Sequence, residues 1–330
     1  MRFRDESRVG LKLFVFLFTL LAGWTQARSD ELPVYTRTED VIYGRKYGTA
    51  LTLDVLTPRD KVNGAGVVWV VSGGWFSAHE AINPASVAEY LKRGYTVFAV
   101  VHGSQPKYTI PEVLEDMNRS IRFIRHNAGR FRVNPNRLGI TGGSAGGHLS
   151  LMIGMAGKPG PADAKDPVDR ESSRVQAVGC FFPPTDFLNY GRPGRDVFIV
   201  LEEELKAFKA PFDFRELDPE THRLKFISDK ARRLEIVKQI SPITYVTPDA
   251  PPTLIFHGDA DKLVPLQQSQ EIIQKLEAAH VPARLVVKKG AGHGWDGLQQ
   301  DVAVIADWFD QYLSNAYVSS RPTAPIGEQK

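Results

Sequence analysis

The pattern of hydrophobic and polar positions predicts strands and helices in turn from about Val41 onward. Residues 51–56 alternate apolar and polar side chains, as a half-exposed strand does. Residues 67–71 and 96–101 are continuously apolar and rich in β-branched side chains, which is typical of strands that are covered on both faces. Residues 110–127 carry apolar side chains at spacings of three and four, so they predict a helix with one apolar face.

The same pattern continues along the rest of the chain. Further strands are expected at residues 137–141, 175–182, 254–257 and 284–287, and further helices at 87–92, 145–155, 267–278 and 298–312. Repeated units of strand and helix predict an α/β fold with a mainly parallel sheet and helices on both faces. A chain of 330 residues, 42% hydrophobic and 24% charged, suits one elaborated domain of this class.

One long stretch interrupts this rhythm. Residues 188–239 contain no expected strand and are dense in charged side chains, which predicts a helical insertion. The insertion is either a solvated surface excursion or a cap over a site at this end of the sheet. As a cap, it would turn apolar side chains toward the site, and the candidates are Phe198, Ile199, Leu201, Leu205 and Phe208.

The N-terminal segment has the parts of a secretory signal peptide. Basic side chains precede the apolar run 13–22, and the small residues Thr25 and Ala27 then stand at the two positions that a signal peptidase reads. The run is shorter than the roughly 20 residues that span a bilayer, although an uncleaved anchor remains the alternative. We expect a signal peptide at 1–27, a single mature domain at 28–318 and a disordered tail at 319–330. The protein would be exported, either periplasmic or secreted, with no stable membrane insertion after cleavage.

Charge and cysteine content exclude several classes of partner and site. A net charge of +3 is too weak to suggest a nucleic-acid partner. The single cysteine, Cys180, excludes an internal disulfide and a cysteine-based zinc site. Cys180 lies in an apolar run, so we expect it to be a buried core residue. Export without disulfides fits a bacterial envelope.

A candidate nucleophile stands between an expected strand and an expected helix. Gly142, Ser144 and Gly146 form a Gly-x-Ser-x-Gly motif at this junction. The chain must turn from strand to helix within a few residues, which forces the serine into strained geometry and leaves room only for glycine two positions to either side. Ser144 would then lie above the sheet, beside the positive end of the helix dipole.

With this motif in place, the sequence resembles the α/β-hydrolase superfamily. Within it, the likeness is to the esterase/lipase and prolyl-oligopeptidase-like branch that includes bacterial feruloyl- and acetyl-esterase-type domains. The resemblance extends over about residues 41–312, apart from the insertion. It implies an eight-stranded, mainly parallel sheet, and a catalytic triad in the chain order serine, aspartate, histidine.

The resemblance also indicates the acid and the base. Residues 257–265 resemble the family's His-Gly-x-x-Asp-x-x-Val-Pro stretch, which makes Asp261 the triad carboxylate and Asp259 the close competitor. The carboxylate would accept the far ring N–H of the catalytic histidine and fix its tautomer. His293, flanked by glycines in residues 290–295, resembles the catalytic histidine, whereas His148, His257 and Asp186 are expected to be structural.

The oxyanion hole departs from the family pattern. Gly73, Gly74 and Trp75 align with the end of the relatives' His-Gly-Gly-Gly-Trp motif, but Val71 replaces the histidine and Ser72 the first glycine. The amides of Gly73, Gly74 and Ala145 are expected to hold the oxyanion, and Ser72 could replace the bracing histidine. Trp75 and Trp295 either line the substrate pocket or pack in the core.

These residues favour an exported serine hydrolase that cleaves carboxylic esters through an acyl-enzyme intermediate. Acylated carbohydrates or other small esters are the expected substrates. No cofactor is expected, and no metal site or phosphate-binding loop is evident in the sequence. A serine exopeptidase of the prolyl-oligopeptidase type and a non-catalytic binding protein remain the alternatives. The sequence shows no large domain of repeated strands ahead of the hydrolase region, which argues against the exopeptidase.

Overall fold

A computed structural model describes residues 33–320 of the chain. The predicted signal peptide at 1–27 and most of the predicted tail, residues 321–330, lie outside the described residues. Both therefore stay predictions. Within residues 33–320, no helix is long and apolar enough to cross a membrane.

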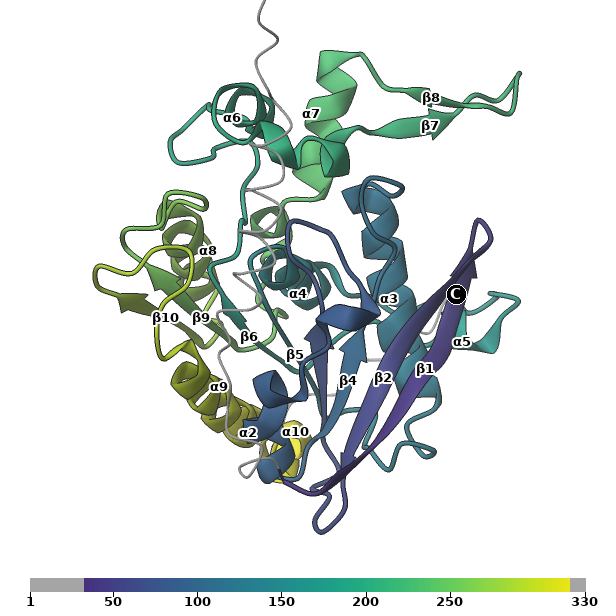
Figure 1. The fold of residues 1–330 in the computed structure, drawn as a ribbon, viewed down its shortest axis with the longest axis vertical. Coiled ribbons are helices and arrows are strands. Elements are labelled where there is room, and N and C mark those ends of the chain that lie inside the picture. Colours follow the sequence, from purple (N-terminus) through teal and green to yellow (C-terminus); the bar gives the residue numbers. More distant parts are fainter. Residues whose placement is uncertain (1–32, 321–330) are drawn as a thin grey trace, which may run out of the picture.

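The core of the fold is a sheet of eight strands, as Figure 1 shows. The strands are β1 (Tyr35–Lys46), β2 (Thr49–Pro58), β3 (Gly66–Val70), β4 (Thr96–Val100), β5 (Leu138–Gly143), β6 (Ala177–Phe181), β9 (Thr253–Gly258) and β10 (Ala283–Lys288). Their order in space is β1-β2-β4-β3-β5-β6-β9-β10. β1 and β2 pair antiparallel, as do β2 and β4, and every other pair is parallel. The predicted eight-stranded, mainly parallel sheet is confirmed, although its first strand begins at Tyr35 rather than near Val41.

Helices cover both faces of this sheet, as predicted (Figure 1). One face carries α2 (Ala88–Lys92) and α9 (Leu298–Tyr312), and the other carries α3 (Ile110–His126), α4 (Ala145–Ala156) and α8 (Gln267–Ala278). Short helices complete the fold: α5 (Pro167–Arg170), α10 (Asn315–Ser320) and the 3-10 turns η2 (His79–Ala81), η3 (Pro84–Val87) and η6 (Pro242–Tyr245).

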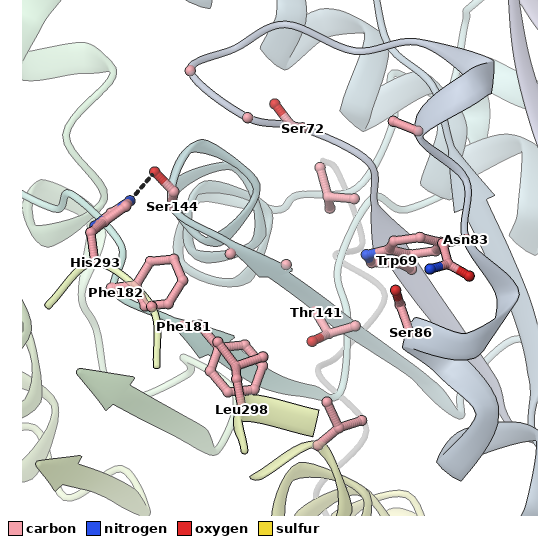
Figure 2. Close-up of a pocket in the computed structure, with 18 of the residues that line it drawn as sticks. Trp69, Ser72, Asn83, Ser86, Thr141, Ser144, Phe181, Phe182, His293 and Leu298 are labelled. Carbon is pink, nitrogen blue, oxygen red and sulfur yellow. Dashed lines mark hydrogen bonds between the residues drawn. The ribbon is translucent and has the colours of Figure 1, made fainter. Parts of the chain in front are cut away.

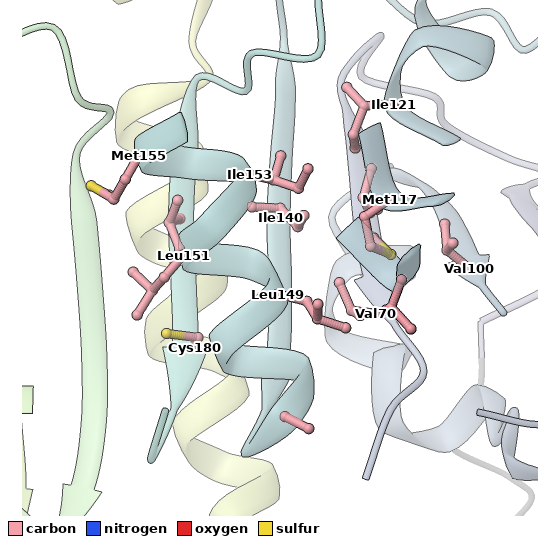
Figure 3. Close-up of a cluster of buried hydrophobic side chains, with 14 of the residues drawn as sticks. Val70, Val100, Met117, Ile121, Ile140, Leu149, Leu151, Ile153, Met155 and Cys180 are labelled. Atoms are coloured by element: carbon pink, nitrogen blue, oxygen red, sulfur yellow. The ribbon is translucent and has the colours of Figure 1, made fainter. Parts of the chain in front are cut away.

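The predicted apolar face of α3 packs against α4 and the sheet. Met117 and Ile121 of α3 are fully buried, and Figure 3 shows them beside the α4 side chains. Thr109 and Glu112 form a capping box at the start of α3, which satisfies backbone N–H groups that the helix cannot pair internally. Cys180 is fully buried in the same core, as expected. The packed sheet and α4 therefore support the residues at the carboxyl ends of the strands and at the N-terminus of α4.

Residues 188–239, which we call the cap, lie beyond the carboxyl ends of the parallel strands (Figure 1). The cap contains α6 (Val197–Glu203), the turns η4 (Lys206–Phe208) and η5 (Ala210–Phe212), and α7 (Lys230–Gln239). It also contains an antiparallel hairpin of β7 (Arg215–Leu217) and β8 (Leu224–Phe226), so the expectation that this stretch has no strand was wrong. These strands have three residues each and are almost entirely exposed, so they leave no alternating burial pattern in the sequence.

Candidate active site

Ser144 occupies the sharp turn between β5 and α4. Its backbone has φ 54° and ψ −119°, a conformation that residues other than glycine rarely adopt. A Cβ on Gly142 would come within 2.6 Å of the Gly146 backbone, and a Cβ on Gly146 within 2.9 Å of the Val70 carbonyl oxygen. The Ser144 N–H also donates to the Phe181 carbonyl at 2.9 Å, which anchors the turn to β6. Both glycines of the motif are therefore sterically required, as predicted.

His293 lies directly beside this serine. Its Nε2 is 2.9 Å from Ser144 Oγ, and its Nδ1 is 2.7 Å from Asp261 Oδ2 (Figure 2 shows the first contact). A carboxylate only accepts, so Nδ1 carries the proton and Nε2 is free to accept from the serine hydroxyl. Gly290, Gly294 and Gly297 of this loop have positive φ, which allows the short reversal that brings the ring over the serine.

Asp261 is held in the orientation that this arrangement needs. Its Oδ1 accepts the N–H groups of Leu263 and Val264 at 2.8 and 3.0 Å, which leaves Oδ2 facing the His293 ring. Burial alone would raise the pKa of the carboxyl, but hydrogen bonds from His257 and His293 outweigh it and hold the pKa below its usual value. Asp261 is therefore a buried carboxylate that stays ionised across the neutral range.

The competing residues have other partners. Asp259 Oδ1 accepts the N–H of Gly290 at 2.6 Å, so it braces the base of the histidine loop. Asp186 accepts the N–H groups of Leu188 and Asn189 within its own turn. His257 faces the Ser269 hydroxyl at 2.7 Å and the Val264 carbonyl at 2.9 Å. His257 Nε2 also lies 3.3 Å from Asp261 Oδ2, so this ring supports the carboxylate from behind. The structure thus brings Ser144, His293 and Asp261 together, and none of Asp259, Asp186 and His257 takes the place of a triad member.

The predicted oxyanion donors are only partly available. The Gly73 N–H donates to the Phe76 carbonyl at 3.0 Å, and the Phe76 N–H returns a bond to Gly73 at 2.9 Å. Gly74 and Trp75, which lie between Gly73 and Phe76, have φ values of 55° and 60°. Positive φ at both central residues makes this a two-residue hairpin turn of type I′. The prediction that the Gly73 amide binds the oxyanion is therefore wrong in this geometry, because that amide is already paired.

Two of the predicted oxyanion donors remain open. Within the described residues, the N–H groups of Gly74 and Ala145 donate to no other group. The Ala145 amide is at the first turn of α4, where backbone N–H groups have no partner inside the helix and the helix dipole favours negative charge. An oxyanion on a carbon bonded to Ser144 would meet donors of the required kind at this position.

A histidine that the sequence analysis did not single out holds the oxyanion loop, residues 71–76. Ser72 Oγ lies 2.8 Å from His102 Nε2, and His102 Nδ1 lies 2.8 Å from the Gly103 carbonyl. The carbonyl requires a proton on Nδ1, so Nε2 accepts from the Ser72 hydroxyl. Burial lowers the pKa of His102 to about 4, so the ring stays neutral near pH 7. His102 follows the carboxyl end of β4, which lies beside β3 in the sheet. A histidine at this position is the sequence signal that could have placed it next to the oxyanion loop.

Replacing Ser72 with alanine is expected to lower kcat for ester hydrolysis on the order of tenfold, with KM nearly unchanged. The variant loses the bond to His102, so the Gly74 amide is held less firmly where the oxyanion forms, and loss of a whole donor costs about 10²–10³ in kcat. Steady-state kinetics will measure the split. Ser120→Ala removes another buried hydroxyl, in α3, and should leave both constants alone. An unchanged kcat in Ser72→Ala would show that the bond is unimportant to catalysis.

Trp75 links the oxyanion loop to α4 and the cap. Its indole N–H donates to His148 Nδ1 at 3.1 Å, and His148 Nε2 lies 2.7 Å from the Ile240 carbonyl. The Trp75 ring also packs edge-on against Phe212 at a centroid distance of 5.3 Å. His148 is a buried structural residue, as expected, and burial lowers its pKa to about 4. Trp75 combines the two predicted possibilities, because it packs in the core and also lines a small cavity.

Two cavities adjoin Ser144. The larger has a volume of about 340 Å³ and is lined by Ser144, His293, Trp295 and residues of β3, β6, α2 and α9. The smaller, of about 40 Å³, lies between the oxyanion loop and the cap. Leu201, Leu205 and Phe208 of the cap line these cavities, as expected for a cap over the site.

Two other cap residues do not contribute to the cavities. Ile199 is 39% exposed, and Phe198 lies under the Arg233 guanidinium at 3.8 Å. The expectation that these two side chains face the pocket was wrong. Both belong to α6, whose buried side carries Val197, Val200 and Leu201 instead.

Glu39, Asp54 and His79 are close enough to suggest a metal site. However, the Arg37 guanidinium already lies among them: its Nε is 2.7 Å from Asp54 Oδ2 and 3.2 Å from Glu39. Its Nη2 is 3.5 Å from the His79 ring. The Arg37 guanidinium thus occupies the space among these three side chains and offsets part of their charge, so we assign no metal site to this cluster.

Comparisons with known proteins identify relatives among the ester hydrolases. The model of the BD-FAE family matches residues 53–276. Among curated proteins, the chain is 24% identical to the probable carboxylic ester hydrolase LipM of Mycobacterium tuberculosis, over 89% of this chain and 64% of that protein. It is 27% identical to esterase LipC of the same organism, over 79% of this chain and 60% of that protein. The chain thus spans roughly three fifths of the length of these relatives.

Solved structures give the same assignment of the fold. The truncated form of a carbohydrate esterase from gut microbiota is 25% identical, with a TM-score of 0.67 over 87% of this chain and 99% of that one. The propionate-bound esterase Est2 of Thermogutta terrifontis is 23% identical, with a TM-score of 0.63 over 86% and 96% of the two chains. The latter likeness bears on the fold alone, which is that of an α/β-hydrolase.

Proposed function

This chain belongs to the BD-FAE family of α/β-hydrolases, and from that premise we propose that it hydrolyses carboxylic esters through an acyl-enzyme intermediate. The observation that carries the proposal is the unbroken series of contacts from Ser144 through His293 to Asp261. Two relatives that are named as ester hydrolases or esterases support it. The likeness to a carbohydrate esterase supports acylated carbohydrates as substrates.

The contacts of the site give each residue a role. Ser144 Oγ attacks the ester carbonyl while His293 Nε2 takes its proton, and the amides of Gly74 and Ala145 bind the oxyanion. Asp261 fixes the tautomer of His293 and stabilises the imidazolium that forms. His293 then returns the proton to the leaving alcohol, and water attacks the acyl-enzyme through the same base.

The proposal is tested with a panel of substrates. We expect purified protein to hydrolyse acetyl, butyryl or feruloyl esters and to be labelled by a fluorophosphonate probe, because both reactions need an activated serine. Aminoacyl anilides in the same panel separate the esterase from the exopeptidase. Faster cleavage of anilides than of every ester would favour the exopeptidase, and absence of both hydrolysis and labelling would favour a non-catalytic binding protein.

A further inference from the structure

Residues 102–105, which follow β4, hold the oxyanion loop near both of its ends, and we call them the bracing loop. Near the start of the oxyanion loop, His102 Nε2 accepts from the Ser72 hydroxyl at 2.8 Å. Near its end, the Gln105 N–H donates to the Trp75 carbonyl at 3.2 Å. The glycine amide that is open to an oxyanion lies between these two contacts, so its position depends on the bracing loop.

Gly103 is the best-anchored residue of the bracing loop. Its carbonyl accepts from His102 Nδ1 at 2.8 Å, and its N–H donates to Asp116 Oδ2 at 2.9 Å. The carbonyl keeps a proton on Nδ1, which leaves Nε2 to accept from Ser72. A Cβ on Gly103 would lie 2.8 Å from Asp116 Oδ2 and 2.7 Å from the Tyr108 ring, so the carboxylate can approach this closely only because residue 103 is a glycine.

Asp116 belongs to α3 and is paired with a lysine from β1. Its side chain is 3% exposed, and its Oδ1 lies 2.7 Å from Lys46 Nζ. The Lys46 ammonium also donates to the Glu112 carbonyl at 2.9 Å and lies 4.3 Å from the centre of the Tyr108 ring. Burial raises the pKa of Asp116, and the charge and hydrogen bond of Lys46 oppose this rise. Lys46 therefore compensates a negative charge that the fold buries behind the bracing loop.

Stability alone does not account well for this buried pair. Apolar side chains of similar volume often stabilise a fold more than a buried ion pair does. Neither Asp116 nor Lys46 lines the two cavities beside Ser144, so neither is placed to contact a substrate there. One oxygen of Asp116 binds Lys46 and the other holds the Gly103 amide, which favours a role in the geometry of the bracing loop.

We propose that Asp116 is a positioning residue for the oxyanion hole, a role that rests on the proposed esterase function and acts through Gly103 and His102 on the oxyanion loop. Donors that are already in place stabilise an oxyanion most, because they do not have to move when the charge develops. The substrate carbonyl carries little charge before the attack, so a displaced donor weakens the transition state more than it weakens substrate binding. Loss of the Asp116 contact should therefore lower kcat rather than raise KM.

The test compares two side chains of similar shape at position 116. Lys46→Met accompanies both changes, so that neither variant leaves a buried charge without its partner. The amide oxygen of Asp116→Asn can still accept the Gly103 N–H, whereas Asp116→Leu offers no acceptor. We expect kcat for ethyl acetate to be on the order of tenfold lower in the leucine variant than in the asparagine variant, with KM alike in both. Steady-state kinetics will measure this difference.

A loss of stability without a change at Gly103 provides the control. Ile121 is fully buried in α3, and Ile121→Val removes one methyl group from the same helix. We expect this variant to unfold at a lower temperature and to keep its kcat. If Ile121→Val lowered kcat as much as the leucine variant, the effect at position 116 would be one of stability alone. Should the leucine variant not fold, Asp116→Ala with Lys46→Met takes its place, because alanine also lacks an acceptor.

Adding Ser72→Ala to both variants tests the path to the oxyanion loop. Without the Ser72 hydroxyl, His102 has lost its contact with this loop, so its own position should matter less. We therefore expect the tenfold ratio of kcat between the asparagine and leucine variants to fall to about threefold or less. A ratio that Ser72→Ala leaves unchanged would show that Asp116 does not act through His102.

The outcomes separate the positioning role from the esterase function. Equal kcat in the asparagine and leucine variants, with ethyl acetate turned over by the wild type, would overturn the role of Asp116 and leave the esterase function standing. Absence of ester turnover and of fluorophosphonate labelling in the wild-type protein would instead refute the esterase function itself.

Discussion

Replacing Ser144 with alanine is expected to abolish ester hydrolysis while leaving the protein folded. His293 and Asp261 cannot form an acyl-enzyme without the hydroxyl, and loss of the nucleophile in a comparable triad lowers kcat by about 10⁶. Alanine can occupy the strained turn as serine does, because the turn depends on Gly142 and Gly146 rather than on the Ser144 side chain. Initial rates with ethyl acetate and a thermal unfolding curve will measure the two effects.

A second buried serine provides the matched control. Ser150 lies in α4, and its hydroxyl donates to the Gly146 carbonyl at 2.7 Å, so Ser150→Ala removes a hydroxyl from the same helix without touching His293. We expect this variant to keep its activity and its fluorophosphonate labelling. Activity of Ser144→Ala within a few-fold of the wild type would show that another group is the nucleophile.

The sequence predicted those elements whose burial pattern is regular and long. The helices at 267–278 and 298–312 have the predicted bounds, because each buries one apolar face along its whole length. The hairpin in the cap was missed for the opposite reason. Leu217, Leu224 and Phe226 are all more than half exposed, so hydrophobic side chains in these strands do not mark a buried face.

The candidate site shows the same division between local and long-range information. The motif around Ser144 is local, because Gly142 and Gly146 are needed within five residues of chain, and so it can be predicted from the sequence. The pairing of the Gly73 amide depends on the hairpin turn that Gly74 and Trp75 form, and a positive φ at a tryptophan has no sequence signal. The contact of Ser72 with His102 joins residues 30 positions apart, in the loops that follow the neighbouring strands β3 and β4.

The choice between Asp261 and Asp259 as the acid could not be settled by the resemblance alone. The two carboxylates are two residues apart, and a small change in the loop after β9 would exchange their positions. The distinguishing feature is the pair of backbone N–H groups, from Leu263 and Val264, that hold Oδ1 of Asp261. They form only because the chain turns back at this point, so the assignment depends on the geometry of the loop.

The same pair of N–H groups makes Asp261→Asn a severe substitution. The amide oxygen of asparagine must accept those two bonds, so its NH2 group faces His293 Nδ1, which can no longer donate. The ring then carries its proton on Nε2 and cannot accept one from Ser144. We expect kcat to fall on the order of 10⁴, as the corresponding change does in serine proteases, with little change in KM.

Asp259→Asn is the matched control for this prediction, and it should be nearly silent. The contact of Asp259 is a bond accepted from the Gly290 N–H at 2.6 Å, which an amide oxygen accepts equally well. Steady-state kinetics of both variants on one ester, with unfolding curves to show that each is folded, compares the two carboxylates directly. If Asp259→Asn were the more damaging change, the acid assignment would be reversed. Because fluorophosphonate labelling also needs the serine activated by His293, Asp261→Asn should slow labelling as well as turnover, whereas a defect in substrate binding alone would leave labelling fast.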